Sequence, residues 1–540
     1  MQRRRFLGVL GAGTLGLAAA TPATAELEYT ETDVRIKSFD GTEIAATLFE
    51  PTKPGRYPVV LGTHGWGGSR SASIGRNYAP RGYVVLSYGS RGFGESEGEV
   101  GVDGPKEVAD VSALIDWLEG REKVRVEGEN GASVGMIGGS YAGGIQLNAA
   151  AVDDRIDAIV PRIAWHDLNY SLQPNGVVKT VWGLGLYGVG IAGSRTRVVG
   201  ENSSPDARTN DAARGISPTV HRSIAEGMAL NSFSQPSQAF FAARSPYHKM
   251  DALDVPALFV QGWTDHLFVP NEAIWNFEAF RNRGRDAKLI MYNGGHSQIP
   301  VDSSPEQAES ARDKATRAWL AEHLGSRDDA SVDAVFDDHD VLVYESQTER
   351  MRGANAIPQR NADTVELDLS EGASTPDNAV GASLVGNTVA PIANSYVVSQ
   401  SFDGATSVAF EFDASDAFGL DDGQQADLLT VPEIDLRIRT LGTEATLFFR
   451  VFHVSEDGGE THINDNVTPL RIEATPETVH TETLELIAFQ RYVSPGDTIR
   501  LVVDSTDAGF NSARESAGAI VEHDSTLRIP GVAVLDEQVV

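Results

Sequence analysis

The stretch that decides the fold is GMIGGSYAGGIQLNAA, residues 135–150, which sets five glycines and an alanine around one serine before continuing in helix-favouring residues. An apolar run precedes Ser140, so this serine stands where a strand passes into a helix. Such a nucleophile elbow strains the serine backbone and needs small residues two positions before and after it. Gly138 and Ala142 meet that need, and the following helix would direct its first amides at developing negative charge. The pattern predicts Ser140 as a nucleophile.

Two other interpretations of this glycine-rich turn are close packing of the backbone and a phosphate cradle. The cradle requires a Gly-Lys-Ser/Thr ending, which the sequence lacks here. A second glycine pattern, GLGLYG at residues 183–188, has the spacing of a dinucleotide site. No strand precedes it and no βαβ unit surrounds it, so it predicts a helix or loop.

A serine hydroxyl is a weak nucleophile, so it needs a histidine base and a carboxylate that holds the imidazole in one tautomer. In the α/β-hydrolase arrangement these residues follow in the order Ser, acid, His at the ends of successive strands. Asp265 follows the predicted strand 256–262, and His296 follows the predicted strand 288–294. Order and placement together predict a triad of Ser140, Asp265 and His296. A neighbouring histidine beside the acid, His266, is a competing base that would have to turn back on the carboxylate.

Acyl transfer also needs two hydrogen-bond donors for the oxyanion. The backbone amide of Tyr141, the residue after the nucleophile, supplies one. The His-Gly-x-Gly-Gly turn at residues 64–68 predicts the other at the amide of Trp66, although this turn equally suits a tight glycine bend with Trp66 as packing. No His and carboxylate cluster has metal-ligand spacing, so neither a metal nor another cofactor is predicted.

The pattern of apolar and polar residues changes along the chain. Short β-branched runs alternate with amphipathic helical patterns from residue 30 to about 325, which predicts a largely parallel sheet covered by helices. Many short alternating segments follow, separated by Gly, Asp and Pro turns, and predict an antiparallel β-sandwich. The fold class is therefore α/β with a C-terminal sandwich. The predicted units are a signal peptide (1–25), the first part of an α/β-hydrolase core (26–164), a helical cap insertion (165–250), the second part of the core (251–330) and the sandwich (331–540).

The charge and composition of the chain limit the kinds of molecule that its surface can bind. The 540 residues are 41% hydrophobic, enough to bury large cores, and the net charge is −32. Such a surface repels nucleic acid and anionic membranes. Only eight of the 44 basic residues are lysines, and high acid with few lysines is typical of proteins from salt-saturated cells. We interpret the chain as halophilic, the alternative being an ordinary acidic enzyme.

The N-terminus, RRRFLGVLGAGTLGLAAATPATA at residues 3–25, has a charged region, a short apolar region and a small-x-small cleavage site. The paired arginines followed by Phe-Leu resemble a twin-arginine export signal. The apolar run is shorter than the roughly 20 residues that span a bilayer. We therefore expect a secreted, extracellular protein whose mature chain starts at Glu26. The sequence has no cysteine, which excludes disulfides, a catalytic thiol and a thioether lipid anchor.

The motifs GGSYAGG (138–144), SRGFGESEG (90–98) and GGH (294–296), with the stretch 245–268, resemble the X-Pro dipeptidyl-peptidase and cocaine-esterase (CocE/NonD) family of serine acyl hydrolases. The resemblance covers nearly the whole mature chain. It implies an α/β-hydrolase core, a helical cap before the acid strand and a C-terminal jelly-roll sandwich. It also implies a Gly-x-Ser-Tyr-x-Gly elbow and the same three triad residues.

Two positions depart from the family pattern. The family usually has an aspartate two residues before the Arg-Gly of its Arg-Gly-x-Gly-x-Ser segment, where this chain has Gly89. Members often supply an oxyanion donor from a tyrosine hydroxyl in the early loop, where this chain has Trp66. The resemblance therefore leaves the second oxyanion donor open.

The sequence leads to two hypotheses of function. The first is an exported serine hydrolase acting on small carboxylic esters or short X-Pro-type peptides, with Asp167 and Glu226 as candidate ligands of a substrate ammonium. Trp165, Trp182 and Tyr187 would equally suit an aromatic acyl pocket. The alternative is a catalytically inactive protein that binds carbohydrate or a surface through its β-sandwich.

Overall fold

The structure is a computed structural model. It describes residues 26–127, 131–195, 215–296, 306–325, 331–369, 373–374, 395–398, 400–401, 404–405, 407–476, 478–511, 519–522 and 524–540. The predicted signal peptide, residues 1–25, lies outside the described residues.

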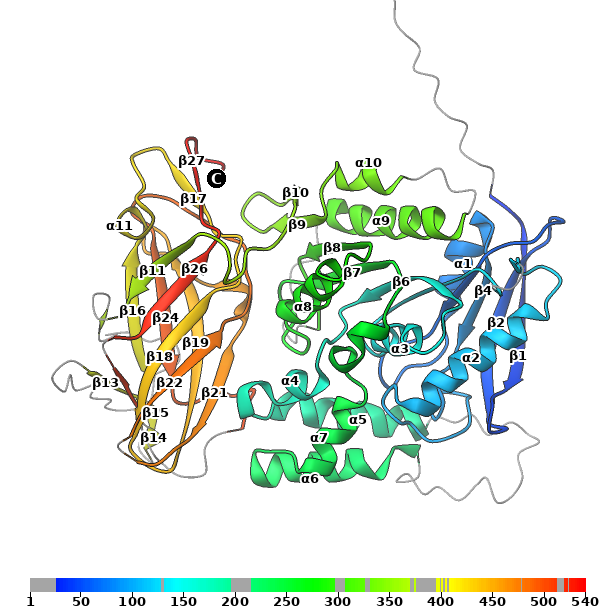
Figure 1. The fold of residues 1–540 in the computed structure, drawn as a ribbon, viewed down its shortest axis with the longest axis horizontal. Helices are drawn as coiled ribbons and strands as arrows, with labels where there is room; N and C mark the ends of the chain where they lie inside the picture. Colours follow the sequence, from blue (N-terminus) through cyan, green and yellow to red (C-terminus); the bar gives the residue numbers. More distant parts are fainter. Residues whose placement is uncertain are drawn as a thin grey trace, which may run out of the picture.

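A mixed ten-stranded sheet forms the core, in the order β1-β2-β4-β3-β5-β6-β7-β8-β9-β10 (Figure 1). Neighbouring strands from β4 to β9 pair in parallel, whereas β1, β2 and β10 add antiparallel edges. The predicted central strands are all present, within one or two residues of their expected bounds. The strands are β1 (Tyr29–Lys37), β2 (Glu43–Pro51), β3 (Val59–Gly62), β4 (Val84–Tyr88), β5 (Val134–Gly139), β6 (Ile156–Arg162), β7 (Ala257–Gly262), β8 (Ala287–Tyr292), β9 (Val341–Glu345) and β10 (Arg350–Ala354).

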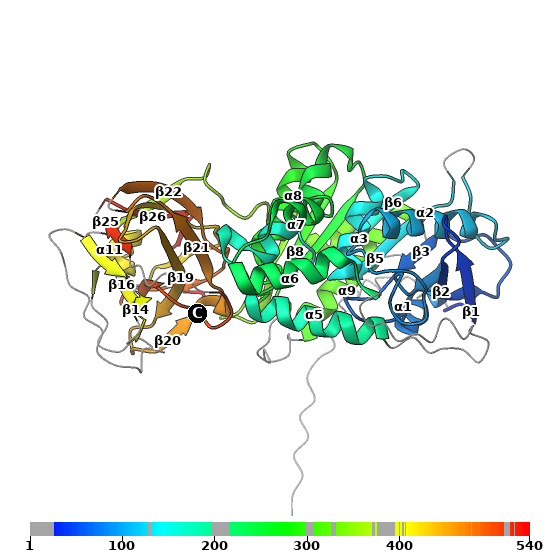
Figure 2. The ribbon, with the colours of Figure 1, turned by 90° about the horizontal axis from the view of Figure 1, so that it is seen from below.

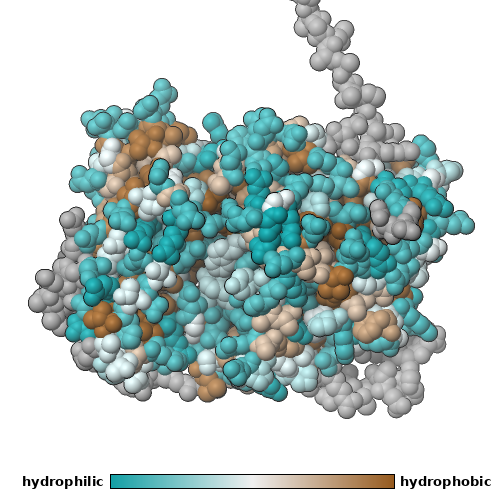
Figure 3. Space-filling model, viewed as in Figure 1, coloured by the Kyte–Doolittle hydropathy of each residue, from teal (hydrophilic) through white to brown (hydrophobic). Residues whose placement is uncertain are grey.

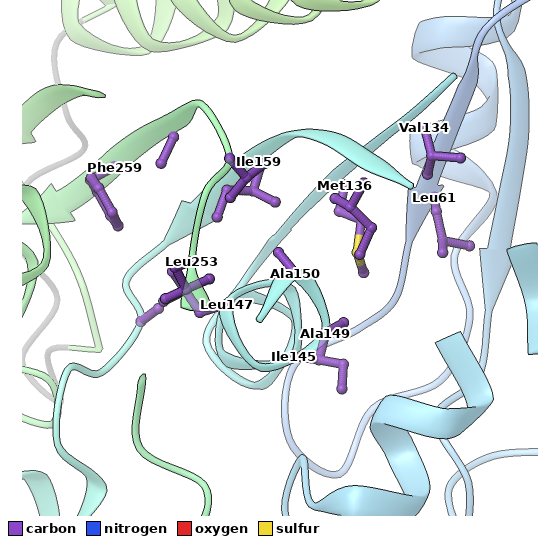
Figure 4. Packing of buried hydrophobic residues seen from close by; sticks show 14 of the residues in the cluster. Leu61, Val134, Met136, Ile145, Leu147, Ala149, Ala150, Ile159, Leu253 and Phe259 are labelled. Carbon is purple, nitrogen blue, oxygen red and sulfur yellow. The ribbon is translucent and has the colours of Figure 1, made fainter. Parts of the chain in front are cut away.

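Helices cover both faces of this sheet because its central strands are apolar on both sides. Met136, Phe259 and Leu289 pack with α2, α3 and α8, while their neighbours Ile137, Leu258 and Ile290 pack with α1, α9 and α10. Figure 4 shows α3, the helix after Ser140, with its apolar side chains among those of the strands. The helices are α1 (Ala72–Tyr78), η1 (Ala79–Arg81), α2 (Pro105–Glu119), α3 (Tyr141–Ala150), α8 (Pro270–Arg281), α9 (Glu306–Leu324) and α10 (Val332–Phe336).

A helical cap is inserted between β6 and β7, which are neighbours in the sheet although a long segment separates them in sequence. The GLGLYG stretch falls inside α5 and is therefore helical. Figure 2 looks onto α5 and α6, which lie side by side below the core. The cap elements are α4 (Leu168–Leu172), η3 (Pro174–Gly176), α5 (Thr180–Arg195), α6 (Pro218–Leu230), α7 (Gln235–Ala242) and η6 (Pro246–Ala252).

Two antiparallel sheets form the C-terminal region and share one apolar core. This agrees with the predicted antiparallel sandwich; its jelly-roll topology stays a prediction. One sheet holds β11 (Thr364–Asp368), β13 (Ser395–Val398), β18 (Glu433–Thr440), β22 (Val479–Glu485), β25 (Ala519–Glu522) and β26 (Thr526–Pro530). The other holds β12 (Ala373–Ser374), β16 (Ser407–Asp413), β19 (Glu444–Val454), β20 (Glu460–His462), β21 (Thr468–Glu473) and β24 (Thr498–Asp504). Smaller elements are β14 (Gln400–Ser401), β15 (Gly404–Ala405), α11 (Ala414–Phe418), β17 (Gln425–Asp427), η7 (Ile463–Asp465), β23 (Tyr492–Val493) and β27 (Ala533–Leu535).

The core sheet extends past the boundary expected at residue 330. β9 pairs in parallel with β8, and β10 pairs with β9, although both fall within the interval 331–540 expected for the sandwich. All five residues of β9 are buried, so the strand gains more as the next strand of the core than as an exposed linker. The two units thus meet after β10.

The sandwich is bound to the core by buried polar contacts. The Asn271 side chain of α8 donates to the carbonyl of Leu486 at 3.0 Å and accepts from the amide of Ala488 at 2.8 Å. Asn466 donates to the carbonyl of Trp263 at 2.8 Å, just before the turn that carries Asp265. These contacts place sandwich loops beside the functional end of the core sheet.

The outer surface is largely hydrophilic. Figure 3 shows hydrophilic residues over most of the face seen in Figure 1, with small separate apolar areas. The first part of the segment SRGFGESEG, residues 90–94, is buried. Here the Arg91 guanidinium donates to Asp110 from Nε at 2.6 Å and to Asp40 from Nη1 at 3.0 Å. At position 89, the chain has glycine where the family usually has aspartate. A Cβ on Gly89 would lie 3.0 Å from the Ser96 hydroxyl, which leaves little room for an aspartate side chain.

Candidate active site

Ser140 occupies the turn between β5 and α3 in a strained backbone conformation, with φ 59° and ψ −123°. The turn is tight because the chain doubles back within two residues on either side. A Cβ placed on Gly138, whose φ is 155°, would lie 2.5 Å from the Cβ of Ala142. Small residues at these two positions are therefore required by contact, as the sequence pattern indicated.

Asp265 and His296 are in direct contact. They follow β7 and β8, which are adjacent parallel strands, so both lie at the same edge of the sheet as Ser140. His296 Nδ1 lies 2.8 Å from Asp265 Oδ2, and the Asp265 side chain is completely buried. The other oxygen, Oδ1, accepts hydrogen bonds from the amides of Leu267 (3.0 Å) and Phe268 (2.9 Å). Asp265 thus holds one nitrogen of the imidazole in place.

Two glycines allow the histidine loop to approach the acid. Gly294 and Gly295 have φ values of 142° and 132°, which residues with a side chain rarely adopt. A Cβ on Gly295 would lie 2.5 Å from the Cβ of Asp265. The Gly-Gly-His sequence is therefore a packing requirement of the Asp265–His296 contact.

The second imidazole nitrogen of His296 has no partner. Nε2 is buried and makes no hydrogen bond to the described part of the chain. The rings of Phe268 and Trp182 lie edge-on to the imidazole, with centroids 5.1 and 6.2 Å away. No hydrogen bond joins Ser140 to His296 within the described ranges; instead, Phe268 and Ser140 line the same cavity. The structure brings Asp265 and His296 together and places Ser140 beside their aromatic neighbour.

The two expected oxyanion donors flank the serine. Tyr141 is the first residue of α3, so its amide has no acceptor within the helix. The amide of Trp66 donates no hydrogen bond among the residues described, and a Cβ on neighbouring Gly65 would lie 3.9 Å from Ser140 Cβ. The Trp66 indole is already engaged: it donates to the carbonyl of Leu186 in the cap at 2.7 Å. Only the backbone of Trp66 is left to donate to an oxyanion.

A cavity of about 110 Å³ adjoins Ser140 and is lined mainly by apolar and aromatic side chains of the core and cap. The candidate aromatic residues Trp165 and Tyr187 are among them, whereas Trp182 contacts His296 instead. Part of the GLGLYG stretch in α5, including Leu186, also lines this cavity. The cap therefore supplies apolar side chains to the cavity that Ser140 also lines.

The candidate ammonium ligands lie elsewhere. Asp167 accepts hydrogen bonds from the amide of Asn169 (2.9 Å) and the hydroxyl of Ser245 (3.1 Å) at the start of α4. Glu226 accepts from the amide and hydroxyl of Ser234. Neither lines the cavity, and no Asp or Glu of the described residues does. Both carboxylates stabilise the cap.

Sequence reasoning missed two buried groups of opposite charge near the acid, Lys179 and Glu272. Lys179 and Glu272 are 3% and 0% exposed. The Lys179 ammonium donates to the carbonyls of His266 (2.9 Å) and Leu267 (2.8 Å), while Glu272 accepts from the amides of His166 and Asp167. Burial lowers the pKa of Lys179 and raises that of Glu272, whereas their opposite charges act against both shifts. A lone lysine in the apolar stretch VVKTVWG was the available signal.

The competing base, His266, points away from the acid. Its Nε2 lies 3.4 Å from the carbonyl of Asn464 in the sandwich, and burial lowers its pKa.

The described residues hold no group of three or more metal-ligating side chains. None of the described helices has the length and apolar composition to cross a bilayer.

Comparison with known proteins places the chain in a family. Residues 40–298 match the sequence profile of the X-Pro dipeptidyl-peptidase (S15) family. A candidate Xaa-Pro dipeptidyl-peptidase of Rhodopirellula baltica is 24% identical over 272 residues, which are 47% of this chain and 42% of that protein. A second candidate, from Bacillus anthracis, is 34% identical over 126 residues, 21% of this chain and 20% of that protein. The chain thus spans less than half the length of these curated relatives.

Solved structures share the fold over almost the whole chain. An α-amino acid ester hydrolase has a TM-score of 0.68 at 16% identity, covering 97% of this chain and 100% of its own. A CocE/NonD family hydrolase from Staphylococcus aureus has a TM-score of 0.65 at 16% identity, covering 96% and 99%. The match over residues 40–298 confirms the predicted family and the enzyme class that this family defines, the serine hydrolases, and the solved structures show a shared fold.

We expect Gly295→Ala to lower kcat for ester hydrolysis more than tenfold, because the new Cβ pushes the His296 loop away from Asp265. The strained φ should also lower the free energy of unfolding by about 1–3 kcal/mol. Steady-state kinetics and urea unfolding measure the two effects. Gly284→Ala is the matched control, since Gly284 has a φ of 70° but open space around its Cβ position. Equal kcat in both variants would contradict the packing argument.

Proposed function

We propose that the protein is an exported serine hydrolase that forms an acyl-enzyme on Ser140 and cleaves carboxylic esters or X-Pro-type peptide amides. The observation that supports the proposal best is the hydrogen bonding of the two ring nitrogens of His296. Its Nδ1 is bound by the buried Asp265, while its Nε2 is buried and has no hydrogen-bond partner among the described residues, at the sheet edge where Ser140 lies. An imidazole held in this way is ready to accept a proton from a nucleophile.

In the proposed reaction, Ser140 Oγ attacks the substrate carbonyl carbon while its proton passes to His296 Nε2. Asp265 accepts the Nδ1 hydrogen bond and stabilises the resulting imidazolium. The amides of Tyr141 and Trp66 donate to the oxyanion of the tetrahedral intermediate. His296 then gives the proton to the leaving alcohol or amine, and water, activated by the same imidazole, releases the acid from Ser140.

In the proposed reaction, the hydrogen bond between Ser140 and His296 forms in the substrate complex. Catalytic hydrogen bonds are often long or absent without substrate and tighten in the substrate complex. The strained backbone at Ser140 supports this assignment, because strain of this kind is retained where the surrounding structure over-determines it.

The shape of the site favours esters with an apolar acyl group. Such a group would enter the cavity beside Ser140, where Trp165, Leu168 and Phe241 give it apolar contacts. A dipeptidyl-peptidase must instead bind a substrate ammonium, and the carboxylates of Asp167 and Glu226 accept hydrogen bonds outside that cavity.

We expect Ser140→Ala to abolish both ester turnover and covalent labelling by a fluorophosphonate probe, because the nucleophilic oxygen is removed. His296→Ala should lower kcat by about 10⁴-fold or more. Circular dichroism of each variant checks that the fold is intact. Folded wild-type protein that neither labels nor turns over any ester would contradict the proposal and favour the inactive binding protein.

We expect the purified protein to hydrolyse p-nitrophenyl esters of aromatic or medium-length acids with a higher kcat/KM than Ala-Pro-p-nitroanilide. The apolar cavity contributes binding energy to an apolar acyl group and offers no carboxylate among its described lining. The comparison is made side by side in high and low salt. A preference for the dipeptide substrate would overturn the ester assignment while leaving the serine mechanism intact.

We propose that the chain is halophilic and secreted through twin-arginine export, as its charge of −32 and its N-terminal pattern support. Replacement of both Arg3 and Arg4 by lysine should keep the protein inside the cell. Immunodetection in medium and cell fractions measures this. Unchanged secretion would rule out the twin-arginine route.

A further inference from the structure

We propose that Lys179 is a positioning residue for the catalytic pair, because its ammonium holds the turn that carries Asp265 through two peptide groups. The kinetic part of this inference rests on the proposed function. Its structural part concerns the Asp265–His296 hydrogen bond and is tested without turnover.

The two peptide groups join residues 266 to 267 and 267 to 268. Their N–H groups, from Leu267 and Phe268, both donate to Asp265 Oδ1 at 3.0 and 2.9 Å. Their carbonyls, on His266 and Leu267, both accept from Lys179 Nζ at 2.9 and 2.8 Å. Each peptide dipole therefore lies between an ammonium and a carboxylate and is aligned with both charges.

This arrangement determines which oxygen of Asp265 is left for the base. Oδ1 is held by the two amides, and Oδ2 accepts from His296 Nδ1. The same turn sets the position of Phe268, whose ring lies edge-on to the imidazole at 5.1 Å. A shift of the turn would therefore move both Asp265 and Phe268 relative to the imidazole of His296.

A purely structural role for the lysine makes a different prediction. Lys249 provides the comparison, because its ammonium also donates inside the fold, to Asn148 Oδ1 at 2.6 Å and to the carbonyl of Ala243 at 2.8 Å. Neither acceptor belongs to the catalytic turn. Loss of Lys249 should therefore cost stability alone, whereas loss of Lys179 should also change the chemistry.

The charge of Lys179 faces several titratable groups. They are Asp265 and His266 on the acid turn, Glu272 on α8, and Asp465 and Asp507 on sandwich loops that line a neighbouring cavity with it. Replacement of the lysine by an uncharged residue therefore removes a positive charge that acts on Glu272 and Asp265, together with the two hydrogen bonds to the acid turn.

The test compares Lys179→Met with Lys249→Met in ester hydrolysis. We expect Lys179→Met to lower kcat about 10- to 100-fold with KM within about twofold, because the acid is no longer held in position. Lys249→Met should retain the wild-type kcat after correction for any loss of folded protein.

Chemical rescue separates charge from packing. The chain has no cysteine, so the Lys179→Cys variant has a single thiol, at position 179. Aminoethylation of that thiol in the unfolded variant, followed by refolding, restores an ammonium group on a side chain of nearly lysine length. We expect the modified protein to regain kcat relative to the unmodified Cys variant. Wild-type protein carried through the same treatment is the control, and this comparison also serves if Lys179→Met does not fold.

A spectroscopic readout is independent of turnover. The proton between His296 Nδ1 and Asp265 should give a downfield NMR resonance that is absent in His296→Ala. We expect it to broaden or shift in Lys179→Met and to stay unchanged in Lys249→Met. If wild-type protein is inactive, the proposed function fails but this measurement still decides the inference. A wild-type kcat together with an unchanged resonance in Lys179→Met would overturn the positioning role.

Discussion

One buried carboxylate, that of Asp265, organises the functional end of this molecule. A buried charge is tolerated only when hydrogen bonds replace its lost hydration. Here the amides of two residues of its own turn satisfy Oδ1, and the imidazole of His296 satisfies Oδ2. The glycines before His296, the turn after β7 and the cap lysine above that turn all serve this one contact. Each would be difficult to explain without it.

The fold of the core sheet places Ser140, Asp265 and His296 at one edge. Parallel strands end at the same edge of a sheet, so the loops after β5, β7 and β8 meet although the residues they carry are far apart in sequence. The cap closes that edge from one side, with Trp66 of the core bound to Leu186 of α5. The sandwich closes another side through α8 and the loop around Asn466. The edge of the sheet that carries Ser140, Asp265 and His296 thus lies close to all three parts of the chain.

Prediction from sequence succeeded where the signal was local. The elbow at Ser140 needs small neighbours within two residues, and the central strands are short apolar runs, so both are visible in a single stretch. It was less informative where a feature depends on distant contacts. The boundary expected at residue 330 precedes β9 and β10, which join the core sheet only through pairing with β8. The partners of Lys179, the indole contact of Trp66 and the capping roles of Asp167 and Glu226 could not be seen in any window of sequence.

The sequence by itself determined the class of fold, the strained serine turn, the family and the order of the three polar residues. These follow from residue size, hydrophobic period and motif spacing, which act over a few neighbouring positions. Only the tertiary structure decided that Asp265 meets His296, that His266 turns toward the sandwich, and that apolar cap residues rather than Asp167 or Glu226 face the cavity. The reason is physical: hydrogen-bond partners and cavity walls are decided when segments between 31 and 198 residues apart pack together.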